Sequence, residues 1–245
     1  MTSSDLWDAE TAESYDDSMA YMSAPEVLDP TVAFLADLAG DGPALELAIG
    51  TGRVAVPLHR RGVPMSGIEL SQPMIDVLRL KVSAEQVPVV VADMATATVV
   101  GDFALVYLVF NTIGNLRTQD EQAETFRNAA RHLRPGGRFV VEVGVPSLRR
   151  LPPGQTATPF HVGEDHVGLD TYDLATQDAV SHHFSRQPDG SWRYGVHHFR
   201  YVWPSELDLM ARLAGLELER RVADWAGAEF TGNSESHVSV WRKPV

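Results

Sequence analysis

The residue types with the clearest chemistry surround a glycine turn. An apolar stretch over 44–49 runs into Gly50-Thr-Gly52, and a helical pattern follows over 53–61. Because glycine has no Cβ, such a turn lets the backbone approach a ligand closely at the carboxyl end of a strand. The spacing also fits the dinucleotide pattern G-x-G-x-x-A. Glu46, four residues before the first glycine, favours a cationic ligand instead, because its charge would repel a pyrophosphate.

Four further segments follow this turn in order. They are Gly67-Ile-Glu69-Leu70-Ser-Gln-Pro-Met74, Val91-Ala-Asp93-Met94, Asp102-Phe-Ala-Leu-Val-Tyr-Leu-Val-Phe110-Asn111-Thr112 and Leu133-Arg-Pro-Gly-Gly-Arg-Phe139. Together with the glycine turn they resemble the five motifs of class I S-adenosylmethionine-dependent methyltransferases, over roughly residues 40–145. A dinucleotide-binding enzyme would explain the first two motifs and leave the others unaccounted for.

The resemblance implies a cofactor and a role for each motif. S-adenosyl-L-methionine binds with its methionine end at the glycine turn, Glu69 holds the ribose hydroxyls, and Asp93 with the next backbone N–H reads the adenine; S-adenosyl-L-homocysteine is the product. The aromatic N-terminal segment that includes Tyr15 is similar to a cap over the cofactor. The implied cofactor contacts are Tyr15, Glu46, Ala48, Gly50, Gly52, Arg53, Glu69, Leu70, Met74, Asp93, Met94, Phe110 and Asn111.

The elements that must position these residues alternate between strand and helix from 44 to 143. This alternation predicts an α/β fold of parallel βαβ units with helices on both faces of the sheet. The resemblance implies a Rossmann-like, doubly wound, seven-stranded sheet that is mostly parallel, with an antiparallel last strand. We expect residues 1–245 to form a single methyltransferase domain, with a helical N-terminal cap over 1–40 and an antiparallel β insertion over 145–203, after the fifth strand.

The methyl acceptor is expected to be a small molecule. The DNA amino-methyltransferase signature, Asp or Asn followed by Pro-Pro and an aromatic residue, is absent after the fourth strand, where 110–115 read Phe-Asn-Thr-Ile-Gly-Asn. The β insertion is similar to that of actinobacterial enzymes that methylate amino groups on deoxysugars, which implies that it covers the acceptor and helps to form a homodimer. Natural-product amines, phenols and acids stay open as acceptors, and so does the choice between nitrogen and oxygen.

The insertion carries six of the nine histidines, and two of them are candidates for the catalytic base. A histidine can take a proton near neutral pH, and His197 and His198 lie on the last predicted strand of the insertion. Adjacent residues on a strand point to opposite faces, so only one of the two can face the acceptor and the pair cannot chelate a metal. We therefore expect in-line methyl transfer without a metal. Candidate acceptor-binding residues are Asn111, Tyr201 and Trp225.

Composition excludes several other functions. Acidic residues outnumber basic ones by 33 to 20, a formal charge of −13, which argues against a nucleic-acid partner. The absence of cysteine excludes disulfides, Cys-ligated zinc and thiol nucleophiles. The most apolar stretch, 103–110, is far shorter than the roughly 20 residues that span a membrane, so we expect no membrane partner and a cytoplasmic location. Two alternatives stay open: a non-catalytic protein that binds the same cofactor, and a nicotinamide-dependent oxidoreductase.

Overall fold

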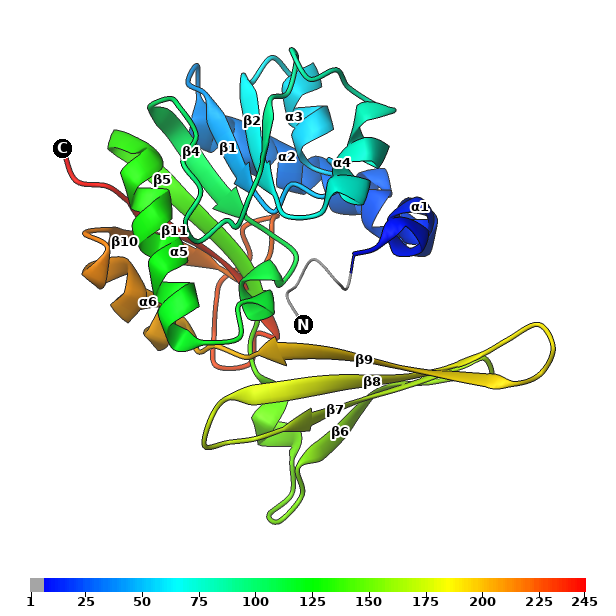
Figure 1. Cartoon of the computed structure of the whole chain (residues 1–245). Helices are drawn as coiled ribbons and strands as arrows, with labels where there is room; N and C mark the ends of the chain where they lie inside the picture. The colour runs from blue at the N-terminus through cyan, green and yellow to red at the C-terminus, as the bar shows by residue number, and fades with distance from the viewer. Residues whose placement is uncertain (1–6) are drawn as a thin grey trace.

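A seven-stranded sheet forms the centre of the computed structural model, which describes residues 7–245 (Figure 1). The strand order is β10-β11-β5-β4-β1-β2-β3, and β11 alone runs antiparallel to its neighbours β5 and β10. The strands are β1 (Ala44–Leu47), β2 (Met65–Glu69), β3 (Val89–Val91), β4 (Phe103–Leu108), β5 (Leu133–Gly144), β10 (Glu217–Val222) and β11 (Ser236–Arg242). The predicted fold class, a mostly parallel sheet with an antiparallel strand near its end, is confirmed.

Helices cover both faces of this sheet. The helices are α1 (Ala9–Ser18), α2 (Pro25–Ala39), α3 (Ala55–Arg60), α4 (Gln72–Arg79), α5 (Gln119–His132) and α6 (Pro204–Leu213), and the 3-10 helices are η2 (Ala20–Ser23), η3 (Thr112–Asn115) and η4 (Ser147–Arg150). One apolar cluster joins α2, α3 and α4 to the sheet, and a second joins α5 and α6 to its other face. Side chains start two of these helices: Ser71 caps α4 at Met74 N–H, and Thr118 forms a capping box with Glu121 at α5.

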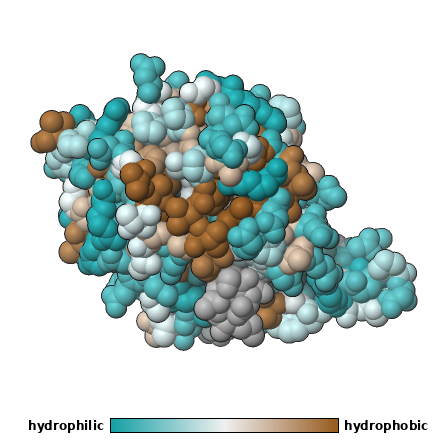
Figure 2. Space-filling view, turned by 45° about the horizontal axis from the view of Figure 1, so that its top comes forward, coloured by the Kyte–Doolittle hydropathy of each residue, from teal (hydrophilic) through white to brown (hydrophobic). Residues whose placement is uncertain are grey.

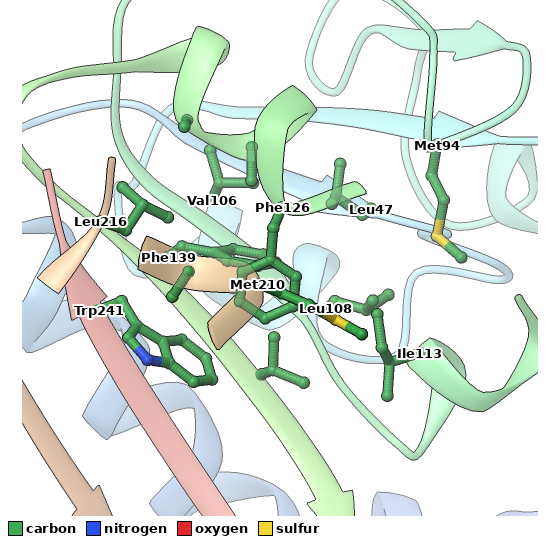
Figure 3. Packing of buried hydrophobic residues seen from close by; sticks show 14 of the residues in the cluster. Leu47, Met94, Val106, Leu108, Ile113, Phe126, Phe139, Met210, Leu216 and Trp241 are labelled. Carbon is green, nitrogen blue, oxygen red and sulfur yellow. The ribbon is translucent and has the colours of Figure 1, made fainter. Parts of the chain in front are cut away.

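Aromatic side chains pack the core beneath α5 and α6 (Figure 3). The ring of Phe126 meets those of Phe139 and Trp241 edge to face, with centroids 5.0 and 5.2 Å away. The Trp241 indole N–H donates to Asp208 at 3.0 Å, so this buried polar group is satisfied. These contacts fix α5 and α6 against β5 and β11. Gln122 of α5 in turn donates a hydrogen bond to η3, the 3-10 helix that follows β4.

A second sheet lies beside the first, at the lower right of Figure 1. It is an antiparallel meander of β6 (Ala157–Val162), β7 (His166–Tyr172), β8 (Asp178–Arg186) and β9 (Trp192–Arg200). The segment 187–190, Gln-Pro-Asp-Gly, is typical of a hairpin turn; it joins β8 to β9 and is closed by a Gln187 N–H to Ser191 C=O hydrogen bond of 2.7 Å. The sequence pattern predicts strands over 167–171, 179–186 and 192–202, which correspond to β7, β8 and β9, and omits β6.

A buried arginine fastens the second sheet to the first. Arg200, 5% exposed at the end of β9, donates to Gln122 of α5 at 2.6 Å and to Glu206 of α6 at 2.8 Å. Gln122 in turn donates to the carbonyl of Ile113 in η3 at 3.1 Å. Because every charged group in this joint has a partner, it holds β9 at a fixed place beside η3.

The molecular surface is mostly polar on the face that Figure 2 presents, apart from an apolar area near the centre of that view. Within residues 7–245, no helix is long and apolar enough to cross a membrane. The first six residues of the predicted cap lie outside the described residues.

Candidate active site

A cavity of about 480 Å³ opens at the carboxyl ends of β1, β2 and β3, a size within the usual range of small-ligand pockets. Eight of the predicted cofactor contacts line it: Tyr15, Ala48, Gly50, Glu69, Leu70, Met74, Asp93 and Met94. Gly52, Arg53, Glu46, Phe110 and Asn111 lie outside the lining. The motif residues therefore gather at the carboxyl ends of these strands. Eight of the predicted contacts line the cavity, and the others lie next to the lining in the sequence or in the sheet.

The glycine turn after β1 has a left-handed backbone. The φ angles are 55° at Gly50 and 81° at Gly52, and a Cβ at Gly52 would lie 2.3 Å from Leu78 Cδ1. A Cβ at Gly50 would meet no protein atom within 4 Å, so the backbone there is open to a ligand. Ala48, which lines the cavity, also has a positive φ of 52°, a conformation that costs free energy for a residue with a Cβ. Strained backbone of this kind concentrates at binding sites.

Glu69 presents a preorganised carboxylate at the end of β2. Its Oε2 accepts the Gly50 N–H at 2.8 Å, and its Oε1 accepts the N–H groups of Leu70 and Ser71 at 2.9 Å each. Burial raises the pKa of Glu69, and the three N–H donors oppose this rise. A carboxylate has about four acceptor positions, so capacity for a ligand hydroxyl remains. This arrangement fits a ribose.

Asp93 and Met94 form the next part of the cavity wall, after β3. Asp93 Oδ1 accepts the Ala95 N–H at 2.8 Å, which fixes the side chain and leaves Oδ2 for a ligand amino group. The carbonyl of Met94 accepts a hydrogen bond from Asn128 of α5 at 2.8 Å. The loop after β3 is thus held in place by α5, and the Asp93 carboxylate with the apolar Met94 side chain fits an adenine.

Glu46 lies away from the cavity and is 3% exposed. The Tyr107 hydroxyl, on the neighbouring strand β4, donates to its Oε2 at 2.8 Å. Burial raises the pKa of Glu46 to about 8, and this rise is opposed by the Tyr107 hydrogen bond, the charge of Arg53 and the Ala55 N–H. The carboxyl is therefore mostly neutral at pH 7 and braces the first turn of α3.

Contacts from α1 hold Tyr15 at the cavity. Asp16 accepts from the Thr51 hydroxyl at 2.7 Å and pairs with Lys81 at 2.5 Å, which ties α1 to the glycine turn and to the residues after α4. Burial raises the pKa of Tyr15, so its hydroxyl stays protonated. Tyr21, by contrast, is 62% exposed and does not line the cavity, so Tyr15 is the tyrosine of the cap that reaches it.

The segment after β4 reaches the cavity through η3. Thr112 and Asn115 line it, whereas Phe110 packs under the Arg53 guanidinium, 5.3 Å from its ring centroid. Asn111 is turned toward β5, where its Oδ1 accepts the Gly144 N–H at 2.6 Å. The Asn111 side chain therefore does not reach the cavity, and the side-chain amide that lines the cavity is that of Asn115.

The two neighbouring histidines of β9, His197 and His198, point to opposite faces of the strand, as the sequence analysis predicts. His197 is half-buried, and its Nε2 lies 3.2 Å from Asn115 Oδ1; His198 is exposed on the other face. Burial, followed by the neighbouring His183, lowers the pKa of His197, which favours a neutral imidazole at pH 7. His197 is therefore the histidine beside the cavity.

The other two acceptor candidates pack elsewhere. The Tyr201 ring meets Tyr172 at 5.8 Å in a small apolar cluster of the insertion. The Trp225 ring meets Phe34 of α2 at 5.4 Å. Neither lines the cavity.

Eight further residues line the cavity and are not among the cofactor contacts that the sequence predicts. They are Trp7, Ile68, Ala92, Thr112, Asn115, Leu116, Arg117 and Glu121. Trp7 lies just before the N-cap of α1, and its ring meets that of Tyr15 edge to face at 5.5 Å. An aromatic residue close before Tyr15 in the sequence is the signal that could have found it. The segment 112–117 has no distinctive residue types, and its place follows from the turn after β4. Among the described residues, no group of three or more His, Asp or Glu side chains could hold a metal ion.

Comparison with known proteins agrees with this geometry. A family model described as a methyltransferase domain matches residues 44–137. The CcbJ methyltransferase from Streptomyces caelestis is 38% identical, with 88% of this chain and 89% of that chain covered and a TM-score of 0.79. The cypemycin N-terminal methyltransferase from Streptomyces sp is 27% identical over 90% of this chain and 93% of its own length. CalS10, an amino pentose methyltransferase from Micromonospora echinaspora, shares the fold at 20% identity and a TM-score of 0.71, with 92% and 95% covered.

The sheet topology and the cavity define a transferase that takes a methyl group from S-adenosyl-L-methionine. The chain belongs to the class I S-adenosylmethionine-dependent methyltransferases. The predicted family and cofactor are thereby confirmed, and methyl transfer is supported over the oxidoreductase and the non-catalytic alternative. Ala48, Gly50, Glu69, Asp93 and Met94 are the residues that fit this cofactor; when bound, it supplies an electrophilic methyl group.

Proposed function

We propose that this enzyme methylates an amine nitrogen of a small, natural-product-like molecule. The observation that carries the proposal is the contact between His197 and Asn115 at the edge of the cofactor cavity. A protonated amine must lose a proton before its nitrogen lone pair can attack the methyl group, and a neutral imidazole held by an amide is suited to accept that proton. The names of two relatives support nitrogen: the cypemycin N-terminal methyltransferase, and a dTDP-4-amino-2,3,4,6-tetradeoxy-D-glucose N,N-dimethyltransferase that is 31% identical over 98 residues.

The chain's own residues then have three tasks. Thr112 and Asn115 orient the acceptor. His197 takes the acceptor's proton at Nδ1, because its Nε2 carries the hydrogen that Asn115 Oδ1 accepts. The insertion keeps water away. Close packing supports the last task, because a Cβ at Gly114 of η3 would lie only 3.6 Å from Phe199 Cβ of β9. In-line displacement requires the nucleophile to be held about 3 Å from the methyl carbon in a dry site.

A methyl-transfer screen tests this function. The protein is incubated with tritiated-methyl cofactor and three probes: dTDP-4-amino-2,3,4,6-tetradeoxy-D-glucose, a peptide with a free N-terminus, and a phenol. We expect label on one of the amines and none on the phenol. Label on the phenol alone would overturn the choice of nitrogen, and no label on any probe together with tight cofactor binding would favour a non-catalytic role.

We also propose that the protein forms a homodimer through the outer face of the insertion. Trp192, Tyr194 and Val196 alternate along β9, so they share one face, and they are 49%, 55% and 40% exposed. Exposed aromatic side chains of this kind are typical of interfaces. Light scattering should give a dimer for the native chain and for the control Leu209→Glu, and a monomer for Tyr194→Glu. The cytoplasmic location stays a prediction.

A further inference from the structure

The backbone at the end of β4 is strained at two successive residues. The φ angles are 58° at Phe110 and 60° at Asn111. Asparagine adopts this left-handed conformation readily, but a bulky residue such as phenylalanine rarely does. A conformation of this kind persists only where its surroundings hold it. Some group must therefore hold Phe110.

That group is Glu142, on the neighbouring strand β5. Its Oε2 accepts the Phe110 N–H at 2.9 Å, and its Oε1 accepts the Trp225 indole N–H at 2.7 Å. Its backbone carbonyl accepts the Asn111 N–H at 3.2 Å. One residue thus takes the N–H groups of both strained residues, and its second carboxylate oxygen is anchored by an aromatic side chain.

The strained turn decides where η3 points. Directly after Asn111 the chain enters η3, and the Gly114 N–H donates back to the Asn111 carbonyl at 2.8 Å. Thr112 and Asn115, the η3 residues at the cavity, are therefore aimed by the two φ angles before them. An extended backbone at 110–111 would send them elsewhere and separate Asn115 from His197.

We propose that Glu142 is a positioning residue for methyl transfer: its carboxylate holds the left-handed turn at 110–111 so that η3 faces the acceptor. The inference rests on the proposed function for this side of the cavity. Glu142 touches neither substrate nor cofactor in this scheme. It acts through the Phe110 N–H, and it leaves the glycine turn, Glu69 and Asp93 unaffected.

Glu142→Gln gives a specific test, because an amide has one acceptor oxygen where the carboxylate has two. The Phe110 N–H and the Trp225 indole N–H would compete for the single amide oxygen. The donor that does not reach the oxygen would face the amide NH₂. Trp225→Phe removes the indole N–H donor and keeps an aromatic ring at this position. In the double variant the amide oxygen is free for Phe110, so the damage caused by Glu142→Gln should be repaired.

The experiment measures kcat with dTDP-4-amino-2,3,4,6-tetradeoxy-D-glucose, or with the peptide probe if that is the one the native enzyme methylates. We expect Glu142→Gln to lower kcat about tenfold, as the loss of one partly buried hydrogen bond to a charged acceptor implies, with cofactor affinity within about twofold. The double variant should return to the rate of Trp225→Phe. Glu217→Gln, an exposed carboxylate on β10, is the control and should match the native enzyme.

Amide hydrogen exchange of residues 107–116 gives a readout that needs no acceptor. It should accelerate about tenfold in Glu142→Gln and return in the double variant. Native exchange and a native kcat in Glu142→Gln would overturn the inference, as would a loss of kcat that Trp225→Phe does not repair. If the native enzyme methylates no probe, the proposed function fails, and the exchange rates alone then decide whether Glu142 holds the turn.

Discussion

Replacing Glu46 by glutamine should change how the stability of the protein depends on pH. Burial raises the pKa of Glu46 to about 8 in the folded protein, against an ordinary value of 4.5. Between these two values the folded state binds more protons than the unfolded state, so the free energy of unfolding falls as pH rises. Glutamine cannot ionise and resembles the neutral acid, so Glu46→Gln lacks this fall.

The gap between the two pKa values corresponds to about 5 kcal/mol in full, at about 1.4 kcal/mol per pH unit. Roughly 3.5 kcal/mol of this falls between pH 5 and pH 8. Urea denaturation at pH 5, 6.5 and 8 should therefore show the variant gaining that amount relative to the native protein, with Glu217→Gln as the exposed control. Parallel pH dependences in the native protein and in Glu46→Gln would show that Glu46 is ionised when folded, and the reasoning would be wrong.

Four further outcomes are expected. Glu69→Ala should weaken cofactor binding by about 1.5–3 kcal/mol in titration calorimetry, since it removes a charged acceptor; unchanged affinity would remove Glu69 from the site. His197→Ala should lower turnover or acceptor affinity with cofactor affinity within about twofold, whereas the exposed His198→Ala should change neither; equal effects would exclude His197 as the base. Activity should survive EDTA, and a loss that magnesium restores would reveal a metal that orients the acceptor. Ala48→Gly should raise the melting temperature, because relief of a left-handed alanine, about 1–2 kcal/mol, exceeds the added chain entropy of about 0.4–1 kcal/mol.

The sequence predicts the parallel sheet well because each strand there is a short apolar run beside a helix signal. It omits β6 because Pro159 interrupts the run 157–162. Proline is tolerated on an edge strand, and β6 pairs only with β7, so the residue that argues against a strand in fact marks an edge. The apolar pattern predicts the fifth strand over 138–143, but β5 starts at Leu133, because the Pro-Gly-Gly segment is accommodated as an irregularity in the pairing of β4 with β5.

The cofactor side of the cavity follows from the motifs because those residues sit next to strand ends, where local geometry aims them. The direction of the Glu46 side chain does not follow from the motifs, because both faces of β1 are buried. The carboxyl is directed by its partners, first of all the hydroxyl of Tyr107 on the paired strand. The acceptor side depends on the turn at Phe110, which is set by Glu142 far along the chain. Such a long-range contact leaves no local pattern.

The joint at Arg200 makes much of the insertion separable from the central sheet. The buried charge contacts of the insertion lie at its base, with Gln122 and Glu206, while β6, β7 and β8 extend away from the central sheet (Figure 1). Because none of the residues 157–198 lines the cofactor cavity, we expect this segment to be an exchangeable cassette that can be replaced while the methyl-donor site keeps its shape. A chimera that carries this segment from another family member, with the joint retained, should bind cofactor as the native chain does and accept the substrates of the protein that donated the cassette.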